Sequence, residues 1–217
     1  MTGLIFDMDG VIVDSNPVHR EAWEVYNRRF GIETTEEMHQ RMYGKRNDQI
    51  VRDFFQGDLS DAEVFEHGAA KERLFREMFL PRLDSHIVPG LREFLEQHRH
   101  VPMAVASNAE PENIHFVLQA SGLAPFFRAV IDGHQVSRPK PAPDVFLKAA
   151  EALGIPPAEC IVLEDSYTGV QAGLAAGMKV VGLLTTHPEL PGATLTIPDF
   201  RAPQLRAFLS ATMSNGK

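Results

Sequence analysis

The sequence predicts an α/β protein built on a parallel β-sheet that is interrupted once by a helical insert. Short, continuously apolar segments recur along the chain, as is typical of strands buried on both faces of a parallel sheet. Between the later segments lie apolar residues at helical spacing, which is the alternation expected of strand–helix–strand units. A long stretch after the first segment carries helical patterns only, and it marks the insert.

Five apolar segments predict the strands. Helical spacing between the later ones ends at glycine, which is favoured just past the end of a helix. The pattern over residues 114–121 is followed by Gly122, and the pattern over 145–153 is followed by Gly154. The predicted strand segments are residues 4–6, 103–106, 129–131, 161–163 and 180–184.

The insert begins and continues with helix start signals. Ser15 or Asn16 is expected to cap a first helix that has Pro17 in its first turn. Ser60 and Glu63 have the spacing of a capping box ahead of a longer helix. The expected domains are an α/β domain of residues 1–14 plus 85–217 and a helical domain of residues 15–84.

Composition excludes several classes of function. The chain carries 21 Lys and Arg against 29 Asp and Glu, a formal net charge of −8, which argues against binding to nucleic acid or to anionic membranes. No apolar run approaches the ~20 residues of a membrane span, and the first residues lack the pattern of a signal peptide. The single cysteine, Cys160, cannot form an internal disulfide, so we expect a reducing, cytoplasmic location.

Polar residues follow three of the predicted strands. Asp7 and Asp9 follow the first strand, Ser107 follows the second, and Glu164 and Asp165 follow the fourth. Ligands of parallel α/β sheets bind at the carboxyl ends of the strands. The sequence therefore predicts that these side chains meet at one edge of the sheet.

Four carboxylates in one small site repel one another unless a cation is bound. Oxygen ligands favour Mg²⁺ over Zn²⁺, and protein-bound Mg²⁺ often contacts substrate phosphate, as in phosphoryl transfer. Two simpler interpretations are a plain turn at Asp9-Gly10 and a calcium loop of Asp7, Asp9 and Asp14. The turn lacks a following strand to pair with, and the calcium loop lacks a correctly placed glycine and a closing glutamate.

Lys140 lies between two prolines, which restrict its backbone on both sides. A solvated loop lysine is the default interpretation of this position. The alternative is a fixed cation that faces the carboxylates, as a dianionic substrate would require.

Four segments together resemble a known family. Asp7-Met8-Asp9-Gly10-Val11, Ser107, Lys140-Pro141 and Glu164-Asp165 match, in order, the four motifs of the haloacid dehalogenase superfamily. The sequence is similar to the branch that contains β-phosphoglucomutase and related phosphatases. The resemblance spans nearly the whole chain and implies a Rossmann-like core with an inserted four-helix cap domain.

The resemblance also implies catalytic roles. Asp7 would be the nucleophile that forms an aspartyl-phosphate, and Asp9 would be the general acid–base. Ser107 would bind the phosphoryl oxygens beside Asn108, which we expect to contact substrate. Lys140 would neutralise nucleophile and phosphate, and the family often has a cis peptide bond after this lysine.

The resemblance implies a magnesium site at the same place. Mg²⁺ would be held by Asp7, the backbone carbonyl of Met8 and Asp165, with Glu164 close by or acting through water. Asp9 is counted with this metal-binding set.

Cap residues are expected to bind substrate. His19 and Trp23 share a helix face, and the family pattern has a histidine near the leaving group at this spacing; a core histidine packed on the indole is the alternative. Lys71 lies at a position similar to that of a lysine in the family's cap domain. The alternative is a snorkelling lysine, whose alkyl chain packs on apolar residues while its ammonium group stays in solvent. Arg46 resembles a cap arginine that binds a second phosphate, although its spacing from Gly44 is one residue short.

One departure bears on the reaction. Ala109 and Glu110 stand where the mutase has a serine and a lysine that hold the non-transferring phosphate. Because Glu110 would repel a second phosphate, the sequence favours a Mg²⁺-dependent phosphatase acting on a small phosphorylated metabolite, expected to be a sugar phosphate. We expect the protein to be a monomer. β-Phosphoglucomutase activity is the first alternative. A halide-displacing dehalogenase would need no acid such as Asp9, and an inactive binding module would not need all four motifs.

Overall fold

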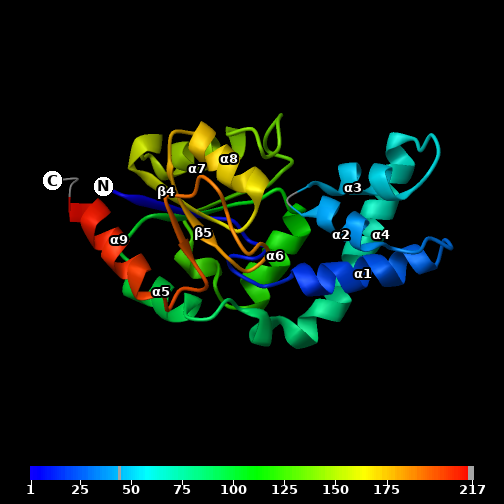
Figure 1. The fold of residues 1–217 in the computed structure, drawn as a ribbon, viewed down its shortest axis with the longest axis horizontal. Helices are drawn as coiled ribbons and strands as arrows, with labels where there is room; N and C mark the ends of the chain where they lie inside the picture. The colour runs from blue at the N-terminus through cyan, green and yellow to red at the C-terminus, as the bar shows by residue number, and fades with distance from the viewer. Residues whose placement is uncertain (44, 215–217) are drawn as a thin grey trace.

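The computed structural model describes residues 1–43 and 45–214, and within them the predicted parallel sheet is present (Figure 1). All strand pairs are parallel and the strand order is β3-β2-β1-β4-β5-β6. This is the order of a Rossmann-like sheet, in which the order of successive strands reverses between β1 and β4. The α/β, Rossmann-like prediction is therefore confirmed. The strands are β1 (Gly3–Phe6), β2 (Met103–Ala106), β3 (Ala129–Ile131), β4 (Cys160–Glu164), β5 (Lys179–Leu183) and β6 (Leu195–Ile197).

Helices cover both faces of the sheet, which explains the unbroken apolar segments. Leu4 and Phe6 pack into the apolar core on one face, whereas Ile5 packs into the core on the other, because successive side chains of a strand point to opposite faces. One face is covered by α5 (Leu91–Gln97), α6 (Pro111–Ala120) and α9 (Pro203–Ser214), and the other by α7 (Asp144–Leu153) and α8 (Tyr167–Ala175).

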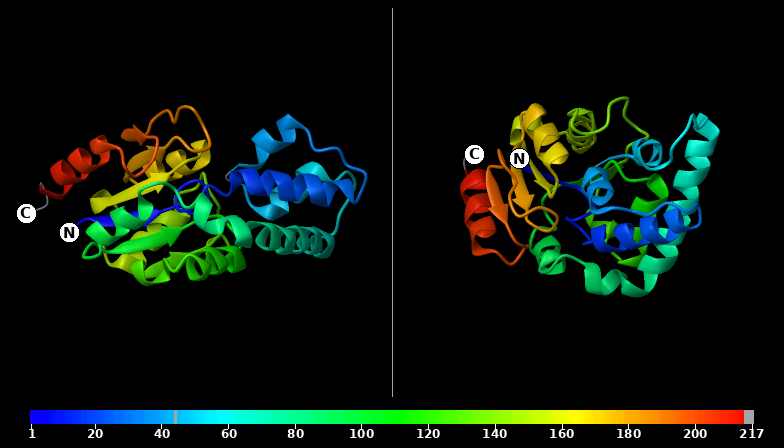
Figure 2. Two further views of the ribbon diagram at one scale, coloured as in Figure 1. Left: turned by 90° about the horizontal axis from the view of Figure 1, so that it is seen from below. Right: turned by 45° about the vertical axis from the view of Figure 1, so that its right-hand side comes forward.

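The insert forms four helices beyond the end of the sheet that lies opposite the chain termini (Figures 1 and 2). They enclose an apolar cluster of their own, which includes Trp23, Tyr26, Val51 and Phe54. The predicted four-helix cap is therefore confirmed. The cap helices are α1 (Asn16–Arg28), α2 (Glu36–Met42), α3 (Asn47–Phe54) and α4 (Asp61–Phe79).

Two chain crossings connect the cap to the sheet domain, and they run side by side. The amide of Asp14 donates to the carbonyl of His86 at 2.7 Å, and Val13 pairs with Ile87. The predicted boundaries at residues 14 and 84 fall close to these crossings, and the division into two domains stays a prediction. The short 3₁₀ helices are η1 (Leu80–His86), η2 (Ala124–Phe126) and η3 (Pro157–Glu159).

The helix start signals have mixed outcomes. Ser60 Oγ accepts from the amide of Glu63, and Glu63 Oε2 accepts from the amide of Ser60 at 2.8 Å, so the predicted capping box is confirmed. Ser15 is the N-cap residue of α1, with Pro17 in the first turn as predicted, but its hydroxyl donates to Asp9 and makes no cap hydrogen bond. No described helix has both the length and the apolar character to cross a membrane.

We predict that Ser60→Ala lowers the free energy of unfolding by about 1 kcal/mol, because the first turn of α4 loses its side-chain acceptor. Urea denaturation followed by circular dichroism measures the change. Glu63→Gln is the matched control, since an amide oxygen can still accept from the Ser60 amide and the loss should be smaller. Equal stability of Ser60→Ala and wild type would contradict a contribution from this cap.

Candidate active site

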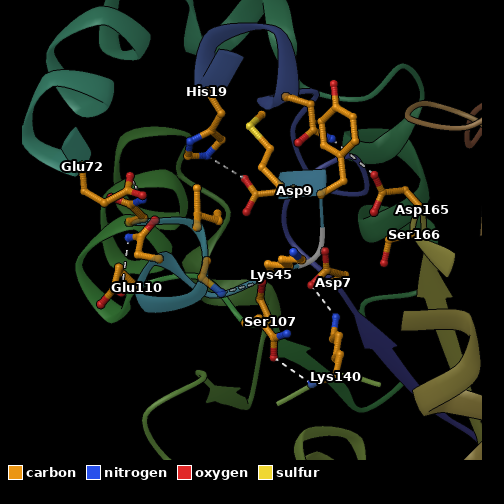
Figure 3. Close-up of a pocket in the computed structure, with 18 of the residues that line it drawn as sticks. Asp7, Asp9, His19, Lys45, Glu72, Ser107, Glu110, Lys140, Asp165 and Ser166 are labelled. Carbon is orange, nitrogen blue, oxygen red and sulfur yellow. Dashed lines mark hydrogen bonds and ion pairs between the residues drawn. The ribbon is translucent and has the colours of Figure 1, made fainter. Parts of the chain in front are cut away.

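A cleft lies between the carboxyl ends of the central strands and the cap (Figure 3). Its empty volume is about 720 Å³, including the part open to solvent. Most of the residues predicted from sequence line it. Those residues are Asp7, Asp9, His19, Trp23, Lys71, Ser107, Asn108, Lys140, Glu164 and Asp165.

Sheet register brings the polar strand ends together. Phe6 of β1 is aligned with Val105 of β2 and with Leu163 of β4, so the residues that follow all three strands emerge at the same edge. The amide of Asp7 donates to the carbonyl of Leu163 at 3.0 Å and continues the ladder into the site. The predicted convergence at one sheet edge is therefore present.

Three buried carboxylates form a cluster at this edge. Ligand oxygens of Asp7, Glu164 and Asp165 all lie within 4.8 Å of one another. Burial raises the pKa of Asp7 to about 7. Burial, with the neighbouring Glu164 and Asp7, raises the pKa of Asp165 well above its usual range. A dense, all-oxygen donor set whose charged form is disfavoured until a cation binds fits a hard divalent ion such as Mg²⁺.

Lys140 is fixed against this cluster. Its Nζ donates to Asp7 Oδ1 at 2.7 Å and to Glu164 Oε1 at 2.6 Å. Burial alone would lower the pKa of Lys140, but the two carboxylates raise it above its usual range. The loop is held by the Lys140 amide, which donates to Asn108 Oδ1, and contains a cis Lys140–Pro141 bond. Because the residue is only 5% exposed, a solvated loop lysine does not describe it.

Two glycines make room for the acidic side chains. A Cβ on Gly169 would lie 1.8 Å from Glu164 Oε1, and a Cβ on Gly10 would lie 1.9 Å from Asp165 Oδ2. Gly10 also has φ of +75°, a conformation that side chains disfavour. These positions therefore accept only glycine without displacing the carboxylates.

Asp165 is tied to the beginning of the cap by two residues that the sequence interpretation missed. Thr186 Oγ1 donates to Asp165, and Asn16 Nδ2 donates to Thr186 Oγ1 at 2.6 Å and to Asp165 Oδ2 at 3.4 Å. Asn16 is the first residue of α1, whereas Thr186 follows β5. No pattern along the chain links residues this far apart.

Asp9 points away from the carboxylate cluster, toward the cap. It accepts from Ser15 Oγ at 2.5 Å, and His19 Nε2 lies 3.5 Å from its Oδ1. Burial alone would raise the pKa of Asp9, but hydrogen bonds from His19 and Ser15 lower it below its usual range. In this arrangement Asp9 is a carboxylate held by two cap residues.

His19 is held between aromatic and charged neighbours. Its ring stacks on Phe75 with centroids 3.7 Å apart, and Lys71 Nζ lies 3.0 Å from its Nδ1. An ammonium group can only donate, so Nδ1 accepts and the proton of the neutral ring lies on Nε2, toward Asp9. These contacts with Phe75 and Lys71 differ from the alternative interpretation, in which a core histidine packs on the Trp23 indole.

Lys71 is 1% exposed and does not snorkel to solvent. Besides His19, it donates to Glu72 Oε1 at 2.6 Å and lies 4.8 Å from the centre of the Trp23 ring. Burial alone would raise the pKa of Glu72, but the ammonium charge and hydrogen bond of Lys71, with the hydrogen bond from Asn113, lower it to about 2. Glu72 was not predicted, although its opposite charge beside Lys71 was a signal in the sequence.

Three predicted residues have other partners. The carbonyl of Met8 accepts from the amides of Ile12 and Val13 within its own loop, and the side-chain carboxylate of Asp9 is outside the three-carboxylate cluster. Their roles as metal ligands stay predictions. Arg46 donates to the carbonyl of Gly133 at 3.4 Å and is not among the cleft-lining residues. Its neighbour Lys45, which was not predicted from the sequence, does line the cleft.

A family model for haloacid dehalogenase-like hydrolases matches residues 1–177. The chain belongs to the haloacid dehalogenase-like hydrolase family. It is 34% identical to fructose-1-phosphate phosphatase YqaB of Escherichia coli, over 82% of this chain and 94% of that protein. It is 28% identical to β-phosphoglucomutase of Bacillus subtilis, over 91% of this chain and 89% of that protein.

Solved structures agree in fold. A β-phosphoglucomutase of Clostridium difficile superposes with a TM-score of 0.85 at 22% identity, covering 99% of this chain and 98% of that one. This haloacid dehalogenase-like hydrolase is therefore an enzyme of the phosphatase and phosphomutase type, with the sheet and cap of the β-phosphoglucomutase branch.

We predict that the metal-free hydrolase loses stability as pH rises from about 4 to 7. Unfolded Asp7 releases its proton near its ordinary pKa of 3.8, whereas the folded site retains it up to about 7, so the folded state binds more protons in this window. With chelator present, the free energy of unfolding of wild type, relative to that of Asp7→Asn, should fall by roughly 2 kcal/mol from pH 5 to pH 7. Urea denaturation of both proteins measures it, and a difference independent of pH would contradict the raised pKa.

Proposed function

We propose that this chain is a Mg²⁺-dependent phosphomonoester hydrolase that acts on a small phosphorylated metabolite, a sugar phosphate, through an aspartyl-phosphate intermediate. The observation that carries the proposal is the placement of Asp7. Its carboxylate lies against the Lys140 ammonium and within the buried cluster that it forms with Glu164 and Asp165. A nucleophile beside a fixed cation and a candidate cation site suits attack on a phosphate dianion.

The first proposed step transfers the phosphoryl group to the protein. Asp7 attacks phosphorus, a new P–O bond forms to its carboxylate, and the bond from phosphorus to the substrate oxygen breaks. Lys140, Ser107 and Asn108 line the same part of the cleft and would hold the phosphoryl oxygens. When bound by Asp7, Glu164 and Asp165, Mg²⁺ would neutralise phosphate charge and orient the group.

Asp9 would exchange protons with the leaving group and with water. In the present arrangement it is a carboxylate held by Ser15 and His19, which is the form that takes a proton from the water attacking the aspartyl-phosphate. Substrate that displaces these donors would remove their stabilisation of the carboxylate. Asp9 could then carry the proton that the departing alkoxide needs.

Relatives support the substrate class. Besides the fructose-1-phosphate phosphatase, the chain is 30% identical to a phosphorylated carbohydrates phosphatase of Thermotoga maritima, over 82% of this chain. Polar cap side chains that reach the cleft, including Lys45, Asn47 and Lys71, suit a hydroxylated substrate. A cytoplasmic location and a monomeric state stay predictions.

We predict that Asp7→Asn lowers kcat at least about 10³-fold, because the amide is a poor nucleophile. Release of phosphate from fructose 1-phosphate with Mg²⁺ measures the loss, and EDTA should abolish wild-type activity in the same assay. Asp58→Asn, on the exposed loop before α4, is the control for an equivalent change elsewhere. Full activity of Asp7→Asn would refute the mechanism.

The mutase alternative rests on the β-phosphoglucomutase relative and on cap residues that reach the cleft. We expect β-glucose 1-phosphate, with a trace of glucose 1,6-bisphosphate, to yield mainly free phosphate. Separate assays for phosphate and for glucose 6-phosphate distinguish the reactions. Accumulation of glucose 6-phosphate faster than phosphate would establish the mutase.

A further inference from the structure

The cleft has more acidic than basic side chains. Among the described residues that line it are six carboxylates and three lysines, with no arginine. Each lysine already contacts a carboxylate within 2.7 Å: Lys45 contacts Asp53, Lys71 contacts Glu72, and Lys140 contacts Asp7 and Glu164. One phosphate can be received beside Lys140, where the carboxylate cluster is also a candidate cation site. The other two lysines that line the cleft are each paired with a carboxylate and have no such cluster beside them among the described residues.

Glu110 lies on the wall of the cleft and is held in place from two sides. Its Oε2 lies 2.7 Å from His134 Nε2, and its Oε1 accepts from Asn47 Nδ2 of the cap at 3.3 Å. The side chain is 29% exposed, so it is open to the cleft. Two partners on different parts of the chain oppose its movement away from an incoming ligand.

A second carboxylate, that of Glu72, contacts α6, the helix that begins directly after Glu110. Its Oε2 accepts from Asn113 Nδ2 at 2.6 Å, and Asn113 lies in the first turn of α6, which Glu110 precedes. Figure 3 shows Glu72 and Glu110 on the side of the cleft away from Asp165 and Ser166. Glu72 is already neutralised by Lys71, whereas Glu110 contacts the amide of Asn47 and the imidazole of His134.

We propose that Glu110 is a specificity-determining residue that restricts the enzyme to substrates with a single phosphate and an uncharged, hydroxyl-bearing remainder. This inference rests on the proposed phosphatase function. Substrate hydroxyl groups can donate to the carboxylates of this wall, whereas a second phosphate would face the Glu110 carboxylate, and the described cleft lysines Lys45 and Lys71 are already paired with carboxylates. Discrimination of this kind works by repulsion of the wrong ligand as well as by attraction of the right one.

The test compares two substrates that differ by one phosphate, fructose 1-phosphate and fructose 1,6-bisphosphate. For wild type we expect kcat/KM to be at least about tenfold higher for the monophosphate, since like charges placed together in a binding site are strongly disfavoured. Glu110→Gln, which can keep the contact with Asn47, should lower this ratio about threefold. Glu110→Lys should lower it at least about tenfold.

Glu151→Gln is the matched control. Glu151 is an exposed residue near the carboxyl end of α7, at the far end of that helix from Lys140, so the ratio should equal that of wild type. Thermal unfolding and hydrolysis of p-nitrophenyl phosphate check that each Glu110 variant is folded and active. Binding of both sugars to Asp7→Asn by calorimetry gives the same ratio without turnover.

The outcomes separate this inference from the function on which it rests. Absence of phosphate release from every substrate, p-nitrophenyl phosphate included, would refute the phosphatase function. Hydrolysis of the monophosphate with no preference over the bisphosphate, or the same preference in wild type and in both Glu110 variants, would refute the role of Glu110 alone. A preference that falls in the order wild type, Glu110→Gln, Glu110→Lys would support it.

Discussion

The buried contact of Lys140 with Asp7 and Glu164 is the interaction on which the rest of the site depends. One ammonium group joins the ends of β1 and β4 through two ion pairs of 2.7 and 2.6 Å. Without it, acidic side chains that are out of water and close together would repel one another. The contact keeps Asp7 at the strand end and offsets only part of the negative charge of the cluster, which leaves an oxygen donor set that fits a divalent cation.

The cap is joined to this site by hydrogen bonds, and its first residues carry most of them. Ser15 and His19 hold Asp9, while Asn16 reaches Thr186 and Asp165. The same short segment begins α1 and connects it to β1. Movement of the cap would therefore change the partners of both Asp9 and Asp165, which links the position of the cap to the chemistry of the sheet edge.

Much of the sheet could be predicted because its strands are continuous apolar segments between polar residues. The segment at residues 103–106 matches β2, and that at 129–131 matches β3. The strand β6 was missed because Thr196 interrupts its apolar residues, whereas β3, which is equally short, is apolar throughout. Ser15 has the residue type of a helix cap, but Asp9 is a charged acceptor nearby in space, and the hydroxyl donates to it instead.

The sequence by itself determined the sheet-edge residues Asp7, Ser107, Lys140 and Glu164, since each occurs in a short motif next to a strand or between prolines. Only the tertiary structure decided which cap residues reach the cleft. Lys45 lines it while Arg46 turns to the carbonyl of Gly133, and Glu72 becomes a partner of Asn113. These contacts depend on how helices far apart in the chain pack against the sheet domain. A shift of one residue along a helix or loop changes whether a side chain faces the cleft or faces away from it.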